Sequence, residues 1–120
     1  MARPMPEQVR ARLAGDLTQA RAAFAHRDSV TGWQLLEEAH VLSQPWAWPH
    51  VRVHLSMLAA GVRAGDWREV AGQVVRTAVA GPGSFVGRYP VGNTGRARVP
   101  ATQPMPMSEE IAKLLEAPSG

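Results

Sequence analysis

Three of the chain's four histidines lie between positions 40 and 54, on either side of the aromatic turn SQPWAWP (43–49). His40 follows Glu37 by three residues, and His54 follows His50 by four. Residues at these spacings share one face of a helix, and both patterns are metal-ligand spacings on neighbouring helices. Three neutral imidazoles with a carboxylate or a water molecule suit zinc, copper, nickel or iron. We therefore predict a divalent transition-metal site with His40, His50, His54 and Glu37 as ligands.

The helices that would carry these ligands are predicted from apolar residues that recur at spacings of three and four. The first predicted helix covers residues 6–26. Every later helix end coincides with a capping or helix-breaking residue. These residues are Asp28 or Ser29 before the second helix, Pro45 at its end, Pro49 at the start of the third, Gly65 at its end, Asp66 before the fourth, and Gly81-Pro82-Gly83 after it.

Short connections between these helices imply that neighbours in sequence run antiparallel. The second and third helices then form a hairpin around the aromatic turn. In that hairpin His40 stands at about the height of His50, and Glu37 at about the height of His54. The alternative is that the imidazoles are packing residues, hydrogen-bonded to the backbone at a seam between helices.

Two apolar stripes are expected to face the core. The stripe of the third helix consists of Val51, Leu55, Leu58 and Val62, and that of the fourth of Trp67, Val70, Ala71, Val74 and Ala78. His50, His54 and Met57 lie about 100° around the third helix from its stripe. The opposite face of the fourth helix carries Glu69, Gln73 and Arg76. This polar face is either solvated or covered by the glycine-rich segment that follows.

The expected fold class is all-α, either a small antiparallel four-helix bundle or a stack of helical hairpins, in one domain over residues 1–120. Core helices span about 6–80, a Gly/Pro-rich segment (81–107) wraps over them, and a short helix covers 108–116. Trp33 and Trp67 begin similar segments 34 residues apart, which is the period of the tetratricopeptide repeat. Two segments are fewer than the three repeats that such arrays need. We therefore interpret the similarity as two related helical hairpins and do not predict a repeat array.

Further candidates for ligand contact lie beside the histidines and in the glycine-rich segment. Trp46 and Trp48 either close the hairpin as a hydrophobic clamp or form an aromatic wall of a pocket. Met57 adds a thioether on the histidine stripe. The segment GRYPVGNTGRARV (87–99) supplies turn chemistry and cations. Its predicted pocket residues are Arg88, Asn93, Thr94 and Arg96.

Composition excludes several classes of function. The chain has no cysteine, so thiolate zinc sites, iron–sulfur clusters and cysteine nucleophiles are ruled out. Its net charge of +3 comes with scattered arginines, which do not form a nucleic-acid footprint. No nucleotide-binding motif occurs, and no signal peptide or membrane span is expected. We expect a cytoplasmic protein that acts on neither nucleic acid nor membranes.

Three stretches, AHVLSQPWAWPHVRVH, GDWREVAGQVVR and RYPVGNTGRARV, follow one another along the chain. Together they resemble a small bacterial family, domain of unknown function 3703, over roughly residues 20–107. The resemblance implies that the histidines and the turn at 92–95 belong to one recurrent design. It implies no activity, because none is established for the family.

Three functions therefore stay open. The leading hypothesis is a cytoplasmic bacterial metal-binding protein that uses the histidine cluster. The second is a small enzyme in which the same histidines act as acid and base in a pocket roofed by the tryptophans. The third is a helical-hairpin interaction module. The corresponding partners are a metal ion or small molecule, or else a protein partner or a second copy of the chain.

Overall fold

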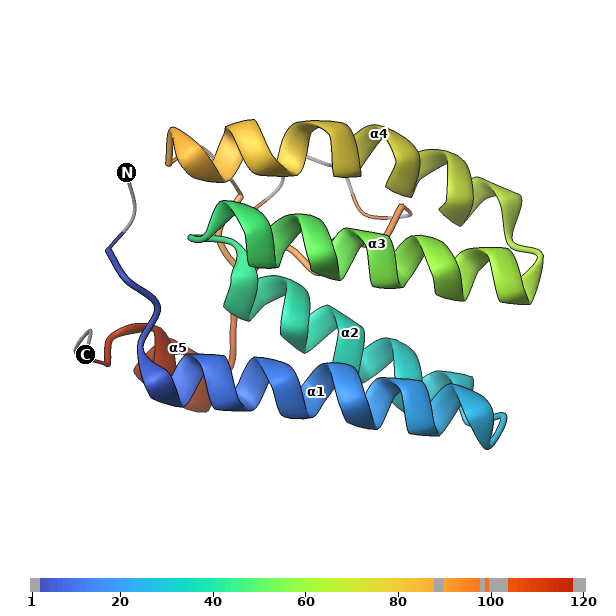
Figure 1. The fold of residues 1–120 in the computed structure, drawn as a ribbon, viewed down its shortest axis with the longest axis horizontal. Coiled ribbons are helices and arrows are strands. Elements are labelled where there is room, and N and C mark those ends of the chain that lie inside the picture. Colours follow the sequence, from blue (N-terminus) through green and yellow to red (C-terminus); the bar gives the residue numbers. More distant parts are fainter. Residues whose placement is uncertain (1–2, 88–89, 98, 100–103, 118–120) are drawn as a thin grey trace.

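A computed structural model describes residues 3–87, 90–97, 99 and 104–117 of the chain. These residues form helices and no strands, which confirms the all-α class (Figure 1). The helices are α1 (Glu7–Ala25), α2 (Ser29–Ser43), α3 (Ala47–Ala64), α4 (Trp67–Phe85) and α5 (Glu109–Leu115).

Side-chain caps fix where the helices begin. The Asp28 carboxylate accepts a hydrogen bond from the backbone N–H of Thr31, and Ser108 caps the start of α5 in the same way. The carboxylate of Asp66 likewise accepts the N–H of Glu69. Gly65 ends α3 with φ of 67°, a left-handed conformation that glycine adopts without steric cost. The predicted ends at these positions are confirmed.

Two predicted helix ends were wrong, both at prolines. Helix α3 begins at Ala47, two residues before Pro49, because N–H groups in a first helical turn have no intrahelical partner and proline loses nothing there. Helix α4 continues through Pro82 to Phe85. Its last turn is closed beyond the proline, since the N–H of Val86 donates to the Pro82 carbonyl at 3.1 Å.

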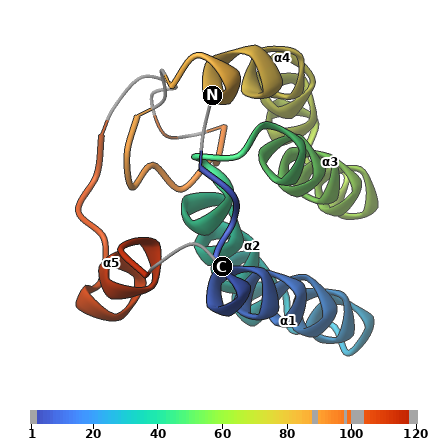
Figure 2. The ribbon, with the colours of Figure 1, turned by 60° about the vertical axis from the view of Figure 1, so that its left-hand side comes forward.

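The helices pack as successive antiparallel hairpins. Helix α1 packs on α2, α2 on α3, and α3 on α4, whereas α1 makes only marginal contact with α3 (Figures 1 and 2). The short helix α5 lies against the N-terminal half of α1 (Figures 1 and 2). This arrangement is a layer of stacked hairpins, and it places α4 at one edge of the described fold.

The apolar core has two parts. The larger joins α1, α2 and α3 and consists of Leu13, Ala20, Leu36, Ala39, Val53, Met57 and Ala60. The second lies where α5 meets the ends of α1 and α2, and consists of Val9, Val41, Leu42, Trp46 and Ile111. Helix α4 contributes to neither cluster, so something other than an apolar core must hold it to α3.

The predicted buried stripes of α3 and α4 were largely wrong. On α3 the buried residues include His50, Val53, His54 and Met57, while Leu55 and Val62 are about half exposed. On α4 the buried residues are Glu69, Gln73, Ala80 and Ser84. The predicted core residues Trp67 and Val74 of α4 are exposed. Helix α4 therefore turns its polar face inward, and the physical reason is the glycine-rich segment.

Residues 90–97 of that segment lie between α2 and α4. The Gln44 side chain donates to the Pro90 carbonyl at 2.8 Å and accepts the Gly92 N–H at 3.1 Å. The Arg76 guanidinium on α4 donates to the carbonyls of Gly95, Arg96 and Val99. The polar face of α4 is thus the docking strip for this segment, which is the second of the two alternatives considered above.

Within the described ranges, none of the helices combines the length and the apolar character needed to cross a bilayer.

A buried acidic residue lies between α1 and α2. Asp16 is 3% exposed, and its Oδ2 has no hydrogen-bond partner among the described residues. Arg12 forms a two-bond ion pair with Glu38, both bonds at 2.9 Å, and lies 3.6 Å from Asp16. Burial, followed by the neighbouring Glu38 carboxyl, raises the pKa of Asp16 to about 8. The Asp16 carboxyl therefore carries a proton at neutral pH.

This carboxyl predicts a pH dependence of stability. Because the pKa of Asp16 is higher in the folded than in the unfolded chain, the folded state binds more protons, and stability falls as pH rises from about 4 to 8. The slope is at most about 1.4 kcal/mol per pH unit for one group. In Asp16→Asn we expect this component of the slope to vanish, as measured by urea unfolding between pH 5 and pH 9. An unchanged slope in Asp16→Asn would contradict the assignment.

Candidate metal centre

Three imidazoles from two helices meet inside the protein. His40 comes from the last turns of α2, and His50 and His54 from the first turns of α3. All three are buried, with exposed fractions of 3 to 5%. Their Nε2 atoms form a triangle with sides of 3.1, 3.1 and 3.2 Å. The histidine cluster His40–His50–His54 predicted from the sequence is close enough to hold one metal ion.

The other ring nitrogen of His40 and of His50 is held by an acceptor. His40 Nδ1 lies 2.6 Å from the carbonyl oxygen of Asn93, which can only accept, so Nδ1 carries the proton. His50 Nδ1 lies 2.7 Å from the Ser84 hydroxyl. That hydroxyl donates its own proton to the Gln44 carbonyl, so it accepts from His50. Both rings therefore have Nδ1–H and an unprotonated Nε2 when neutral.

His54 is oriented by a longer chain of hydrogen bonds. Its Nδ1 lies 2.6 Å from Oε1 of Gln73. The Gln73 amide nitrogen donates to Glu69 and to the Gly95 carbonyl, both at 2.7 Å, which fixes the amide so that Oε1 accepts from His54. Burial raises the pKa of Glu69, but hydrogen bonds from Gln73, Arg96 and the Ala97 N–H outweigh it and lower that pKa overall. A charged carboxylate thus polarises the ring of His54 through Gln73.

The surroundings keep all three rings neutral. Burial lowers the pKa of His40 well below its ordinary value, and the imidazoles of His54 and His50 lower it further. Burial, followed by the imidazole of His54, lowers the pKa of His50 to about 3. Burial also lowers the pKa of His54, against the opposing hydrogen bond with Gln73. Three unprotonated nitrogens therefore point at one another, which is the protonation state that metal ligation requires.

The backbone of the turn at residues 92–95 closes over His40. Gly95 has φ of 84°, and a Cβ at this position would lie 2.5 Å from His40 Cδ2 and 2.9 Å from its Nε2. Only glycine allows the segment to approach the ring so closely. The Oγ1 atom of the preceding residue, Thr94, is buried with no hydrogen-bond partner among the described residues. A buried hydroxyl normally has a hydrogen-bond partner, and a single water molecule would satisfy this one.

Arg96 connects this turn to helices α2 and α4. Its guanidinium lies 3.6 Å from the Trp33 ring centroid and donates to the Glu69 carboxylate at 2.5 Å. It also lies 3.6 Å from Glu37. The predicted ligand Glu37 is thus paired with Arg96 and is outside the group of close ligand atoms, which consists of the three histidines.

The other predicted contact residues lie away from the cluster or take structural roles. Met57 is fully buried in the apolar core. The Trp46 ring is buried in the second core cluster, where its indole N–H donates to the Arg3 carbonyl at 2.6 Å. Trp48 is 76% exposed. Arg88 lies outside the described residues. The tryptophans therefore do not form the walls of a pocket around the histidines.

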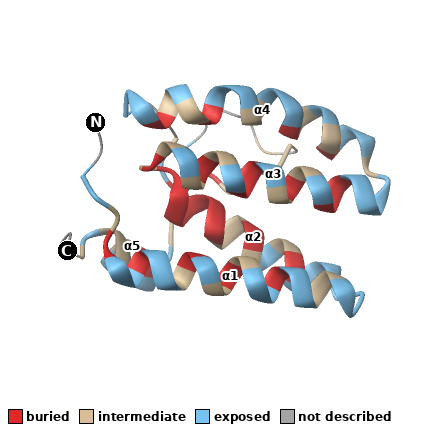
Figure 3. Cartoon of the chain, in the orientation of Figure 1, coloured by how far each residue is buried: buried red, intermediate tan, exposed pale blue. Residues whose placement is uncertain are grey.

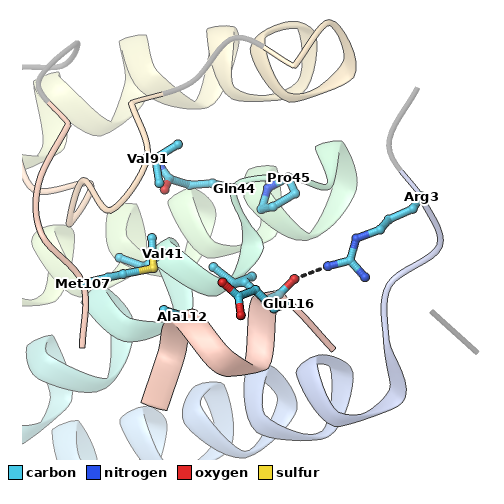
Figure 4. Close-up of a pocket in the computed structure, with 9 residues that line it drawn as sticks. Arg3, Val41, Gln44, Pro45, Val91, Met107, Ala112 and Glu116 are labelled. Atoms are coloured by element: carbon cyan, nitrogen blue, oxygen red, sulfur yellow. Dashed lines mark hydrogen bonds between the residues drawn. The ribbon is translucent and has the colours of Figure 1, made fainter. Parts of the chain in front are cut away.

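A cavity of about 490 Å³ lies elsewhere, between the N-terminal segment, the end of α2 and helix α5 (Figure 4). Apolar side chains such as Val41, Val91 and Met107 line it, and Gln44 and Glu116 add polar groups. None of the three histidines belongs to its lining. The cavity is thus separate from the histidine cluster.

Three residues that orient the cluster were not predicted: Gln73, Ser84 and Gly95. The sequence predicted Gln73 only as part of a polar face. Gln73 follows Glu69 by four residues and precedes Ser84 by eleven, and these spacings place all three residues on one side of a helix, which could have predicted that they face the same site. Ser84 was missed because the helix was expected to stop at Gly81-Pro82-Gly83. Gly95 gave a turn signal, but nothing local connects that turn with a histidine 55 residues earlier.

Comparison with known proteins places the chain in a family. Neither the curated proteins nor the solved structures give a match. One family model matches, described as "Protein of unknown function (DUF3703)". Because this match extends from residue 7 to residue 115, over nearly the whole sequence and all five helices, the chain belongs to the DUF3703 family.

Proposed function

We propose that the protein binds one transition-metal ion through Nε2 of His40, His50 and His54. The observation that carries the proposal is the convergence of three unprotonated nitrogens at 3.1–3.2 Å, with each Nδ1–H already engaged. Lone pairs at this distance repel one another unless a cation lies between them. A proton can join only two of the three nitrogens, whereas a metal ion accepts all three.

The triangle has nearly the size of a metal site. Zinc bound tetrahedrally at about 2.0–2.1 Å places its nitrogen ligands about 3.3–3.4 Å apart. The observed separations of 3.1–3.2 Å need to widen by only a few tenths of an ångström. Each ring also has the outer hydrogen-bond partner that metal-binding histidines generally have.

The donor set indicates the class of metal. Neutral imidazoles suit zinc, copper(II), nickel and iron, whereas calcium and magnesium prefer oxygen ligands. The order of intrinsic affinities favours copper(II) and zinc over iron. Helix α2 does not offer Glu37 as a fourth ligand, since its carboxylate pairs with Arg96. We therefore assign the fourth position to a water molecule or a small anion.

The enzyme hypothesis has less support than metal binding. Acid–base catalysis requires an ionisable group that a substrate can reach, whereas these imidazoles are almost fully buried and stay neutral. The tryptophans expected to roof a substrate pocket lie elsewhere. Cytoplasmic location stays a prediction from the sequence.

Metal content tests the proposal directly. Untagged protein is expected to contain or take up about one zinc or copper(II) ion per chain, measured by elemental analysis after dialysis. The variant His40→Ala/His50→Ala/His54→Ala should bind none. His26→Ala, which removes the one histidine that is exposed and outside the cluster, should bind like the wild type.

Removing three buried rings can also unfold a chain. His50→Gln, a single polar replacement, is therefore measured beside the triple variant, with circular dichroism to monitor helix content. Cobalt(II) serves as a spectroscopic probe, because its visible absorption reports nitrogen ligands in tetrahedral geometry. A folded wild-type protein that takes up none of these ions would refute the proposal.

The substitution Gly95→Ala is expected to weaken metal binding while the helices stay folded. A methyl group there would lie 2.5 Å from the His40 ring, so the ring or the turn must move. We expect metal affinity to fall at least about tenfold, as for other losses of outer support, measured by competition with a chelator. Gly87→Ala is the matched control, because Gly87 has a similar φ of 74° but no atom within 4 Å of its Cβ position. Equal affinities in the two variants would contradict the role of the turn.

A further inference from the structure

Helix α4 presents an apolar face to solvent. Its polar residues Glu69, Gln73 and Ser84 face inward. Its outer side is exposed (Figure 3) and carries large apolar side chains. Large side chains on this side are 55 to 67% exposed. We call this surface the α4 face. It consists of five residues of the helix and one residue just beyond it: Trp67, Val74, Val75, Val79, Phe85 and Val86.

Charge is nearly absent from this surface. Of the exposed positions of α4, only Arg68 carries a charge, and the small residues Ala71, Ala78 and Pro82 fill the spaces between the large ones. An apolar helix face without a partner is unfavourable in water. In stacks of helical hairpins the outermost helix normally has a polar outer surface. Helix α4 lies at the edge of such a stack, but its outer surface is apolar.

We infer that the α4 face pairs with the α4 face of a second copy of the chain, in an antiparallel twofold dimer. Trp67, Ala71, Val74 and Ala78 alternate at spacings of four and three, and the same alternation continues through Gly81 to Phe85. This is the spacing at which two helices pack along a common seam. The alanines allow the two helices to approach closely along it, whereas Gly81 lies on the side toward α3, next to Val51.

The pattern of size and charge favours two antiparallel copies. Large rings lie at the two ends of the stripe, Trp67 and Phe85, and the smaller side chains of Ala71, Val74 and Ala78 lie between them. A twofold axis near the middle of α4 would place each Trp67 beside the other copy's Phe85, as a self-complementary interface requires. The two Arg68 side chains would lie at opposite ends of the pair. A parallel pair would instead bring these like charges together.

The exposed area has the size that a dimer needs. Six large side chains exposed by more than half offer on the order of 100 Å² each, or on the order of 600 Å² in total. A stable interface buries about 800 Å² on each partner, and the alanines and Pro82 add to the six. A membrane surface is a poorer occupant, because membrane-binding helices flank their apolar face with many cations.

Sedimentation velocity over a range of concentrations tests the inference. The wild-type protein is expected to be dimeric in the micromolar range, and Val75→Glu/Val79→Glu to dissociate at least about 100-fold more readily, because like charges would meet in the interface. Helix content should be unchanged by circular dichroism. Val30→Glu is the matched control, since Val30 on α2 is 68% exposed and off the α4 face.

Disulfide formation tests the orientation, because the chain has no cysteine of its own. An equimolar mixture of Trp67→Cys and Phe85→Cys should form mixed disulfide dimers faster than either variant forms its own. Faster dimers of each variant alone would overturn the antiparallel arrangement. A wild-type protein that stays monomeric to about 100 µM, or a dimer unaffected by the two glutamates, would overturn the inference. Monomers that bind anionic lipid vesicles would overturn it in favour of a membrane surface.

Discussion

The fold depends on the burial of three imidazoles at one point. Each ring has a polar hydrogen that must find an acceptor in a region without water, since an unsatisfied buried donor costs about 1–3 kcal/mol. The acceptors come from three directions: the carbonyl of Asn93, the hydroxyl of Ser84 and the amide of Gln73. Two of these belong to α4, so α4 must turn its polar face toward α3. The third belongs to the glycine-rich segment, which must therefore lie over the hairpin.

From this requirement follows the unusual packing of α4. Helices of small proteins normally gain most of their stability from an apolar face, yet α4 contributes to neither core cluster. Its inward contacts include hydrogen bonds and ion pairs: Glu69 with Arg96, Gln73 with His54, and Arg76 with three backbone carbonyls. Ala80 is buried on the same side, but the large apolar residues Trp67, Val74, Val75, Val79 and Phe85 are left outside as a consequence. One orientation of α4 therefore accounts for both features: its polar face supports the histidine cluster, and its apolar face is exposed.

The sequence predicted the parts of this fold that have local causes. Capping residues such as Asp28 and Asp66 determine helix starts through contacts three residues away, and the hairpin around His40 and His50 follows from short connections. Which side of α4 is buried could not be predicted by the same means, because a prediction from hydrophobic periodicity assumes that the apolar side is the buried one. Its true orientation depends on hydrogen bonds to Gly95, Arg96, Ala97 and Val99, which are distant in sequence. The pairing of Glu37 with Arg96 was missed for the same reason.

The turn at residues 92–95 would also limit how quickly the metal ion proposed above exchanges with solvent. Gly95 lies against the ring of His40, and the turn is held through Gln44, Gln73 and Arg76, so uncovering this side of the ring requires several of these bonds to break. Such local openings are rare excursions whose frequency reflects the stability of the segment. An occupant of the centre would consequently be retained kinetically, for times set by the detachment of a loop and only partly by the strength of its own bonds. The protein would then release its occupant slowly even where stronger chelators surround it.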